Sequence, residues 1–382
     1  MTDAPLKGLR VVEMARILAG PWVGQTLADL GADVIKVESP AGDDTRAWGP
    51  PFIERENDKS AAYFHSCNRG KRSIIVDIKT KEGRETLHKL IKRSDVFIEN
   101  FKVGALQKYD LDYQALSEIN PQLIYCSITG FGQTGPYAHR AGYDYLIQGM
   151  AGLMSVTGEP DGEPQKAGVA FADIFTGLYS VIAIQAALAQ RQQTGLGQHI
   201  DMSLLDTLTG VMANQAMNFL STGKSPHRLG NKHPNITPYQ VFEVSNGHLI
   251  IAVGNDRQFG LLCKVLKIAD LATDDRFSTN QARIANRDSL DEILNANIKL
   301  WTKDELLSAL ENEGVPAGPI NTMEEVFADP QVQYRKMQIE NQSVPGVRTP
   351  LAFSDAKLEL GTPSPKLGEH TEEILKELER DN

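Results

Sequence analysis

Cysteine is scarce in this chain of 382 residues, which holds three, at Cys67, Cys126 and Cys263. The number is odd and no C-x-x-C pair occurs, so the sequence indicates neither a disulfide framework nor a thiolate metal site. The eight histidines are scattered without an H-E-x-x-H pattern, and we therefore expect no metal. A G-x-S-x-G segment is also missing, which argues against a serine hydrolase with a nucleophile elbow.

The glycine-rich signatures of nucleotide-binding proteins are missing as well. The turn at residues 19 to 24 reads A-G-P-W-V-G instead of G-x-G-x-x-G, and Pro21 has no amide to offer a pyrophosphate. The G-K-S at residues 223 to 225 lacks the leading glycine of a P-loop. Glu38 stands where a dehydrogenase would place its ribose-binding acid, but the altered turn argues against a nicotinamide enzyme.

Positive charge and long apolar runs are also limited. The net charge of -10 and the pI near 5.4 argue against nucleic acid or an anionic membrane as the main partner. The longest apolar stretch, at about residues 179 to 189, is shorter than the roughly 20 residues that a membrane span needs, and the beginning of the chain does not resemble a signal peptide. We expect a cytoplasmic protein.

Apolar runs and helical stretches alternate along the first half of the chain. Runs typical of strands lie at residues 9 to 14, 32 to 38, 73 to 79, 95 to 101, 123 to 132 and 198 to 204. Helical patterns of 10 to 15 residues separate several of them, so we expect an α/β fold with a doubly wound, Rossmann-like parallel sheet. A long helix is predicted from residue 204 to about 220.

A change in composition marks a second domain. Residues 221 to 238 are rich in proline, asparagine and glycine and predict a linker or functional loop. Residues 239 to 330 begin with a hairpin pattern, YQVFEV and GHLIIAV, followed by helices, which predicts a smaller α/β domain. Residues 1 to 220 then form the N-terminal part of the large domain, and residues 331 to 382, with a C-terminal helix, complete it.

One acid stands among small residues just before an apolar helix. It is Asp173 in AGVAFADIFTGLYS, residues 167 to 180. Aspartate is typical of a helix N-cap, a role that needs no chemistry. The helix dipole would also lower its pKa and keep it ionised for attack on a thioester carbonyl. Amides among the small neighbours could stabilise an oxyanion, so both roles stay open; these neighbours are Gly168, Ala170, Ala172 and Gly177.

Several longer segments occur in the order found in one known family. They are LAGPWVGQTLADLGADVIKVESPAGDDTR (18 to 46), NRGKRSIIVDIK (68 to 79), VFIENF (96 to 101), SITGFGQTGPYAHRAGYDY (127 to 145), TGLGQHIDMSLLD (194 to 206) and LGEHTEEIL (367 to 375). With them the chain resembles the class III CoA-transferases, which include formyl-CoA transferase and the carnitine CoA-transferases. The segments GDDTRAWGPPF, GKSPHRLGNKHP and GNDRQF are most similar to branches that handle succinate, glutarate, oxalate or hydroxymethylglutarate.

The resemblance implies an enzyme that moves CoA from an acyl-CoA, with succinyl-CoA as the first guess, to a free carboxylic acid, with a dicarboxylate as the expected acceptor. The CoA thioester is a co-substrate and no tightly bound cofactor is implied. The nucleophilic aspartate of the family matches Asp173, which would form an aspartyl anhydride and then an aspartyl-CoA thioester. The family also implies an obligate homodimer of interlocked rings.

The resemblance implies CoA-binding residues at the positions that match those of the family, namely Ile17, Leu18, Ala19, Asn100, Phe101, Lys108 and Arg140. Arg69, Lys71 and Arg72 form a basic cluster that we expect to meet the CoA phosphates through charge-assisted hydrogen bonds. An ordinary solvated face is the alternative for this cluster.

The acceptor acid has its own candidates, Tyr143, Arg228, Asn231 and His233. Arginine suits carboxylates and imidazole can donate to one. The last three lie in RLGNKHPNITP (228 to 238), which replaces the glycine-rich loop of formyl-CoA transferase and argues against formyl transfer. A polar interdomain loop is the alternative for this stretch.

Two rival functions remain. An α-methylacyl-CoA racemase needs two bases, and in that branch a histidine of a G-H-D motif supplies one, where AGYDY here has Tyr143. Tyrosine, with its high pKa, is a poor base at neutral pH, which argues against racemisation. A non-catalytic CoA-binding protein would be favoured if Asp173 proved unreachable and served only as a helix cap.

Overall fold

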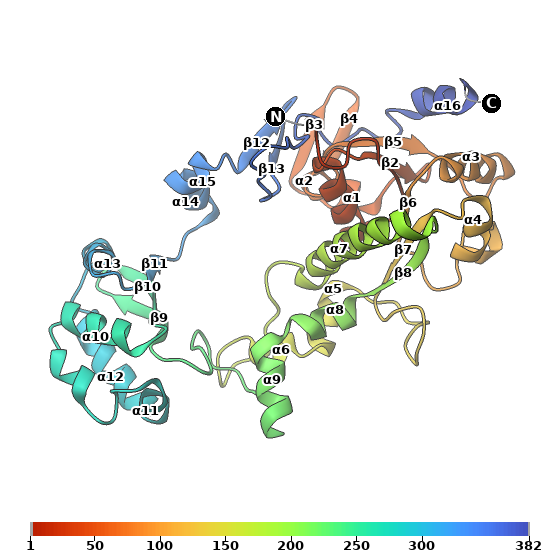
Figure 1. Ribbon diagram of the computed structural model, residues 1–382. Coiled ribbons are helices and arrows are strands. Elements are labelled where there is room, and N and C mark those ends of the chain that lie inside the picture. Colours follow the sequence, from red (N-terminus) through yellow and green to blue (C-terminus); the bar gives the residue numbers. More distant parts are fainter. Residues whose placement is uncertain (1–2, 381–382) are drawn as a thin grey trace. The chain divides into compact units, whose positions relative to one another are not determined.

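Two compact units make up the chain in the computed structural model, which describes residues 3–380 (Figure 1). The larger unit comprises Met1–Leu153, Lys166–Ser221 and Pro330–Asn382, and the smaller unit comprises Met154–Gln165 and Thr222–Asp329. Each unit has its own hydrophobic core.

The segment Met154–Gln165 belongs to the smaller unit, whereas the predicted boundaries assigned it to the large domain. The guanidinium of Arg228 donates to backbone carbonyl oxygens of this segment, at 2.7 Å to that of Gly162. The amide of Gly230 donates to the carbonyl oxygen of Gly158 at 3.0 Å. These bonds join stretches far apart in sequence, so no local pattern could indicate them.

A parallel sheet of six strands in the order β5-β2-β1-β6-β7-β8 forms the centre of the larger unit. The strands are β1 (Arg10–Glu13), β2 (Asp33–Glu38), β5 (Lys71–Ile75), β6 (Val96–Glu99), β7 (Ile124–Thr129) and β8 (Gln198–Ser203). The first strand is central and the chain winds outward in both directions, which confirms the predicted doubly wound, Rossmann-like fold. Such sheets bind ligands outside the carboxyl ends of the strands where the order reverses, here at β1 and β6.

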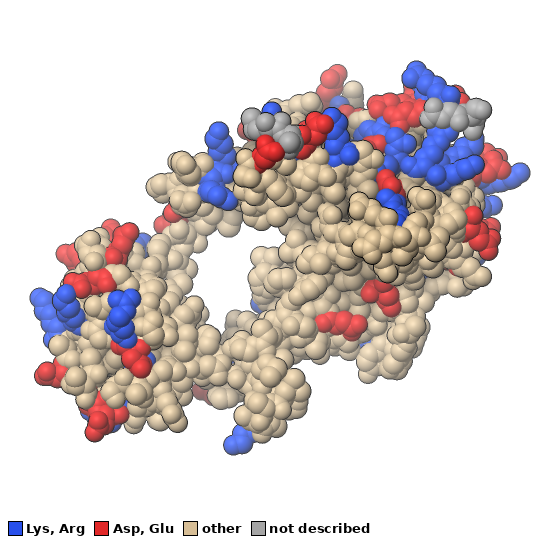
Figure 2. All heavy atoms as spheres, viewed as in Figure 1, with Lys and Arg blue, Asp and Glu red and all other residues tan. Residues whose placement is uncertain are grey.

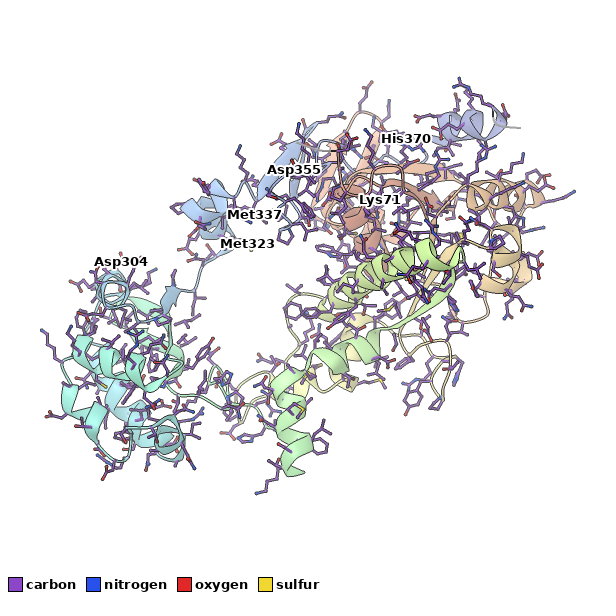
Figure 3. The ribbon with its side chains drawn as sticks, viewed as in Figure 1. Lys71, Asp304, Met323, Met337, Asp355 and His370 are labelled. Atoms are coloured by element: carbon purple, nitrogen blue, oxygen red, sulfur yellow. The ribbon has the colours of Figure 1, made fainter. Side chains whose placement is uncertain are left out.

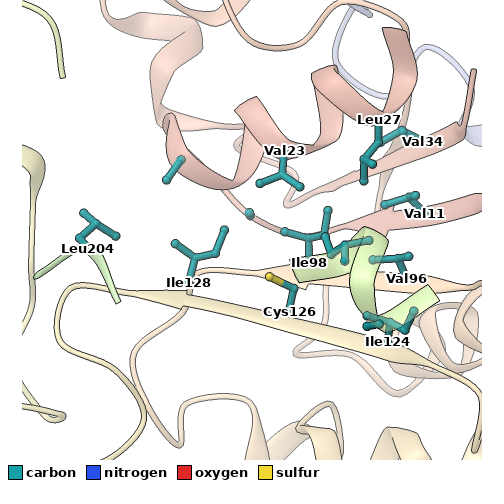
Figure 4. Close-up of a cluster of buried hydrophobic side chains, with 14 of the residues drawn as sticks. Val11, Val23, Leu27, Val34, Val96, Ile98, Ile124, Cys126, Ile128 and Leu204 are labelled. Atoms are coloured by element: carbon teal, nitrogen blue, oxygen red, sulfur yellow. The ribbon is translucent and has the colours of Figure 1, made fainter. Parts of the chain in front are cut away.

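Alternate residues of the central strands pack into cores on opposite faces of the sheet. Val11 belongs to one buried cluster and Val12 to the other, because successive side chains of a strand point to opposite faces. Helices α1 (Ala19–Asp29), α7 (Phe171–Thr194) and α8 (Leu204–Val211) cover the first face; Figure 4 shows Val23 and Leu27 of α1 above the strands. The opposite face is covered by α3 (Lys81–Lys92), α4 (Tyr113–Ile119) and α16 (Thr371–Arg380).

Helix α7, at 24 residues, is long and apolar enough to cross a membrane by length and composition. This corrects the expectation that no apolar stretch reaches that length. Its residues Ala172, Ile184 and Ala187 pack into the core of the first sheet face. That burial accounts for its apolar character on the inner side without a membrane.

The remaining elements of the larger unit are short. The predicted helix at 204 to 220 is two helices, α8 and α9 (Ala213–Thr222), because the chain turns at Ala213 with a φ of 43°. The other elements are β3 (Phe52–Arg55), β4 (Asp58–Ala61), α2 (Ala62–His65), α5 (Asp144–Met150), α15 (Pro330–Tyr334), β12 (Gln338–Asn341) and β13 (Val344–Val347). Helix α6 (Leu153–Val156) belongs to the smaller unit apart from Leu153.

The smaller unit is a three-stranded antiparallel sheet, in the order β11-β10-β9, packed against helices. Strands β9 (Tyr239–Val244) and β10 (Gly247–Ala252) form the predicted hairpin, and β11 (Ala317–Pro319) pairs with β10. Its helices are α10 (Asp256–Val265), α11 (Asn280–Ala285), α12 (Arg287–Ile298), α13 (Lys303–Asn312) and α14 (Met323–Ala328).

Lys71 does not face solvent, although the sequence suggested a phosphate ligand there. It lies inside the larger unit next to α1 (Figure 3) and is fully buried. Its Nζ is 2.7 Å from Oε2 of Glu13, whose Oε1 is 3.0 Å from Nζ of Lys36. Lys36 in turn lies 3.0 Å from Oδ2 of Asp43. Two lysines and two carboxylates thus neutralise one another in the interior.

The two neighbouring arginines also form ion pairs. Arg69, only 5% exposed, donates through Nε and Nη2 to both carboxylate oxygens of Asp29, at 3.0 and 2.6 Å. Arg72 donates in the same way to Asp33, at 2.9 and 2.7 Å. Buried carboxylates neutralise Arg69 and Lys71, which contradicts the prediction that these two residues meet the CoA phosphates. Arg72 is only partly buried, and its role at the phosphates stays a prediction.

Replacement of Lys71 by alanine should lower the free energy of unfolding by about 3–5 kcal/mol, because Glu13 would lose the nearer of its two buried cations. Chemical denaturation followed by circular dichroism measures the loss. Lys89→Ala on the exposed face of α3 is the control and should change stability by less than about 0.5 kcal/mol. Equal, small effects of the two substitutions would contradict a structural role for Lys71.

Candidate active site

The turn between β1 and α1 adopts a strained backbone. Ile17 has a φ of 73°, a conformation that β-branched residues rarely adopt and that is often found at functional sites. The carboxylate of Asp43 accepts the amide of Ile17 at 3.3 Å. Asn100, just after β6, accepts the amide of Arg16 at 2.9 Å and donates to its carbonyl oxygen at 2.7 Å. Side chains from two other loops therefore fix this turn.

A cavity of about 380 Å³ opens beside this turn, at the carboxyl ends of β1, β6 and β7. This is the place where the strand order reverses and where such folds bind ligands. Eight of the predicted site residues line it: Ile17, Leu18, Ala19, Asn100, Phe101, Arg140, Tyr143 and Asp173. Asn100 is a wall residue whose amide group holds the turn.

A second cavity of about 550 Å³ adjoins the first, and Arg16, Phe101 and Ala105 line both. Lys108, a predicted CoA-binding residue, lines the second cavity together with Lys79. The sequence analysis missed Arg16, Lys79 and Lys102 as cavity residues. Arg16 adjoins the predicted Ile17, but nothing in the sequence separates the two lysines from ordinary solvated ones.

Asp173 is the third residue of α7 and does not cap it. The N-cap position is occupied by Ala170, whose side chain cannot accept a hydrogen bond. The amides of Ala172 and Asp173 donate instead to Oδ1 of Asp144, at 2.8 and 3.4 Å. The capping role considered from the sequence is therefore wrong for Asp173, and the amide of Ala172 is not available to an oxyanion.

Residues 6–371, nearly the whole chain, match the family described as CoA-transferase family III. The chain belongs to CoA-transferase family III. A succinate–glutarate CoA-transferase from Agrobacterium fabrum is 58% identical over 392 residues, covering 99% of this chain and 98% of that protein. A succinyl-CoA:glutarate CoA-transferase from Mus musculus is 43% identical, covering 98% of this chain and 87% of that protein.

A solved structure agrees with this assignment. The crystal structure of a CaiB/BaiF family protein from Brucella suis is 66% identical and superposes with a TM-score of 0.90, covering 99% of this chain and 100% of that one. These findings confirm the predicted family and identify the chain as an enzyme that transfers CoA between an acyl-CoA and a carboxylate.

The ionisation of Asp173 depends on its surroundings. Burial, and secondly the negative charge of Asp144, raise its pKa to about 7. The sequence analysis expected a lowered pKa from the helix dipole, and that expectation was wrong. The carboxylate accepts no hydrogen bond from any of residues 3–380, so nothing besides the dipole offsets the cost of burying its charge. An acid with a pKa near the working pH is typical of an active site.

The predicted acceptor residues are divided between the two units. Tyr143 lines the first cavity and is 64% exposed, whereas Arg228, Asn231 and His233 belong to the smaller unit. Arg228 already donates to three carbonyl oxygens of its own unit. Nδ1 of His233 accepts the amide of Asn235 at 3.1 Å, and burial lowers the pKa of this imidazole. Structural bonds thus account for Arg228 and for one nitrogen of His233.

Within the part of the chain that the structure describes, no three His, Cys, Asp or Glu side chains gather in a way that could hold a metal ion. The three cysteines are buried and unpaired.

Asp173→Asn should raise the melting temperature at pH 8, because it removes the free-energy cost of the ionised carboxylate in the folded state. Each kcal/mol removed should raise the melting temperature by about 2–4 °C. Because the pKa in the folded state lies above the ordinary value of 3.8, ionisation destabilises the fold increasingly from about pH 4 to about pH 7 and fully above it. The gain should therefore shrink as the pH falls toward 4. Thermal unfolding across this range measures it.

The control is Asp206→Asn, since Asp206 is the exposed third residue of α8. It should not raise the melting temperature at any pH. A gain for Asp173→Asn that is the same at pH 5 and pH 8 would contradict the raised pKa.

Proposed function

We propose that this enzyme transfers CoA from succinyl-CoA to a free dicarboxylic acid such as glutarate, with Asp173 as its covalent nucleophile. The observation that carries the proposal is the position of Asp173 in the same cavity as the predicted CoA-binding residues of the first turn and of the loop after β6. The choice of acids rests on the names of the relatives from Agrobacterium fabrum and Mus musculus.

The reaction begins when a carboxylate oxygen of Asp173 attacks the thioester carbonyl of succinyl-CoA. The carbon–sulfur bond breaks, which gives a mixed anhydride and the CoA thiolate. The thiolate then attacks the aspartyl carbonyl and releases succinate, which leaves an aspartyl-CoA thioester. The acceptor carboxylate repeats these two steps in reverse, forming its own CoA thioester and freeing Asp173. Each exchange converts one activated acyl bond into another, so no ATP is needed.

The two adjoining cavities suit the two ends of the CoA thioester. The first holds Asp173 and so takes the thioester end, and the second takes the nucleotide end. Cationic side chains along both can form charge-assisted hydrogen bonds to phosphates; they are Arg16, Lys79, Lys102, Lys108 and Arg140. We propose them in place of Arg69 and Lys71. CoA is a co-substrate here, with no tightly bound cofactor.

An exposed apolar face supports the homodimer implied by the family. Leu178, Tyr179 and Ile182 of α7 and Met217 and Leu220 of α9 are exposed. Few charged side chains lie over these helices in the view of Figure 2. Exposed large apolar side chains of this kind are typical of a subunit interface. We propose a cytoplasmic homodimer in which a second copy covers this face.

Asn231, His233 and Tyr143 remain the proposed ligands of the acceptor acid.

The first test is incubation of the purified protein with succinyl-CoA and a panel of free acids, without ATP or metal. Glutaryl-CoA should appear, and Asp173→Ala should reduce its rate by at least about 10³-fold. Mass spectrometry of the CoA thioesters measures both. Proton exchange at the α-carbon of branched acyl-CoAs, without transfer to any acid, would favour the racemase instead.

Lys108→Ala should raise the KM for succinyl-CoA about tenfold with little change in kcat, because a phosphate contact far from the reacting carbonyl contributes equally before and during the reaction. Steady-state kinetics at several salt concentrations measures this, and the effect should weaken at high salt. Lys92→Ala, on α3, is the control. An unchanged KM for Lys108→Ala would exclude this residue from the phosphate site.

A further inference from the structure

A pair of side chains on α5 holds the segment that leads into α7. Oδ1 of Asp144 accepts the amides of Ala172 and Asp173 at 2.8 and 3.4 Å, and its Oδ2 accepts Nε2 of Gln148 at 2.7 Å. Gln148 is fully buried, and its Oε1 accepts the amide of Ala167 at 2.9 Å. The two residues stand four apart on one face of the helix, which lets them act as a single clamp.

The clamp replaces the cap that α7 lacks. The first amides of a helix have no partner within the helix, and here the N-cap residue is Ala170, which offers none. An acid at the third position, such as Asp173, is placed to reach back to the backbone at its own N-cap. Because Asp144 occupies the amides of Ala172 and Asp173 from outside the helix, the carboxylate of Asp173 is left to face the cavity.

We propose that Asp144 is a positioning residue of the transfer reaction: by holding the amides of Ala172 and Asp173, and supported by Gln148, it keeps the nucleophilic carboxylate directed into the CoA cavity. The inference rests on the proposed function, since it assigns a task to Asp144 only if Asp173 is the nucleophile. Asp144 does not line the cavity that Asp173 faces, so its proposed role is to position the nucleophile.

The charge of Asp144 has a second effect on the nucleophile. It adds to burial in raising the pKa of Asp173. Tyr63 of α2 also lies near Asp173, and burial together with that carboxylate raises the pKa of its hydroxyl to about 12, so it stays neutral. The cations of the same cavity are Arg16, Lys102 and Arg140. Removal of the Asp144 charge should therefore extend the activity of the enzyme to lower pH.

Three variants separate the hydrogen bonds of Asp144 from its charge. Asp144→Ala removes both, and kcat should fall by about 10–100-fold across the pH range while the KM for succinyl-CoA changes little. Asp144→Asn keeps an oxygen for the two amides, so the acid limb of the kcat profile should move to lower pH. Asp144→Asn, however, places an amide NH2 group opposite the donor Nε2 of Gln148, so the hydrogen bond between the two side chains is lost. The double variant Asp144→Asn/Gln148→Glu restores an acceptor at this place and should recover the kcat lost with that bond.

Asp201→Asn is the matched control, because Asp201 also accepts a backbone amide, that of Gln133 at 2.9 Å, and lines none of the cavities around Asp173. Its kcat and acid limb should match the unsubstituted enzyme. The proposal is overturned if Asp144→Ala keeps normal kcat, or if Asp144→Asn folds normally and leaves the acid limb in place.

Asp173→Ala, assayed in parallel, distinguishes the two levels of inference. Activity in Asp173→Ala means that the proposed nucleophile is wrong, whatever the Asp144 variants do. Loss of activity in Asp173→Ala with normal Asp144 variants overturns the positioning role alone. Should Asp144→Ala not fold, the shift of the acid limb in Asp144→Asn and the recovery in the double variant still decide the question.

Discussion

Four buried charges under the first turn hold in place the wall of the cavity that Asp173 lines. Glu13 bridges Lys71 and Lys36, and Lys36 bridges Glu13 and Asp43. Burial disfavours the charge of Lys36, but the two carboxylates outweigh it and raise the pKa of this amine, so it stays protonated. Asp43 also accepts the amide of Ile17, whose φ of 73° is strained. The ion network thus fixes a backbone conformation that would otherwise relax, and the cavity forms on it.

Local patterns in the sequence were sufficient to predict the parallel sheet and the burial of both its faces. Val11 and Val12 are both apolar because each faces a covered side of the sheet, and that continuous run is typical of a buried parallel strand. The place of the cavity also follows from the strand order. The particular residues of the first turn and of the loop after β6 were predicted from the family resemblance instead, since no periodicity distinguishes Ile17 from its neighbours.

The failures of the sequence analysis share one cause, which is a partner distant in the chain. Lys71 and Arg69 belong to a basic run that is typical of a solvated surface. They are buried because the carboxylates of Glu13 and Asp29, distant in the sequence, pair with them. Asp173 is of a residue type, and at a position, typical of a helix N-cap. Asp144 on another helix instead accepts the amides at the start of α7. A helix dipole alone predicts a lowered pKa, whereas burial and the charge of Asp144 raise it. Electrostatics of this kind depends on the fold.

The raised pKa of Asp173 also has a meaning for the proposed chemistry. A partly buried carboxylate beside a second one is destabilised as an anion, and both causes disappear once it becomes a neutral anhydride or thioester. The arrangement therefore raises the energy of the free nucleophile relative to its covalent intermediates, in which the negative charge moves to the CoA thiolate or to the departing acid. The hydrogen bonds to Asp144 keep the two carboxylates close at the cost of some stability. One pair of acids thereby sets both the direction of the nucleophile and the energy of its first step.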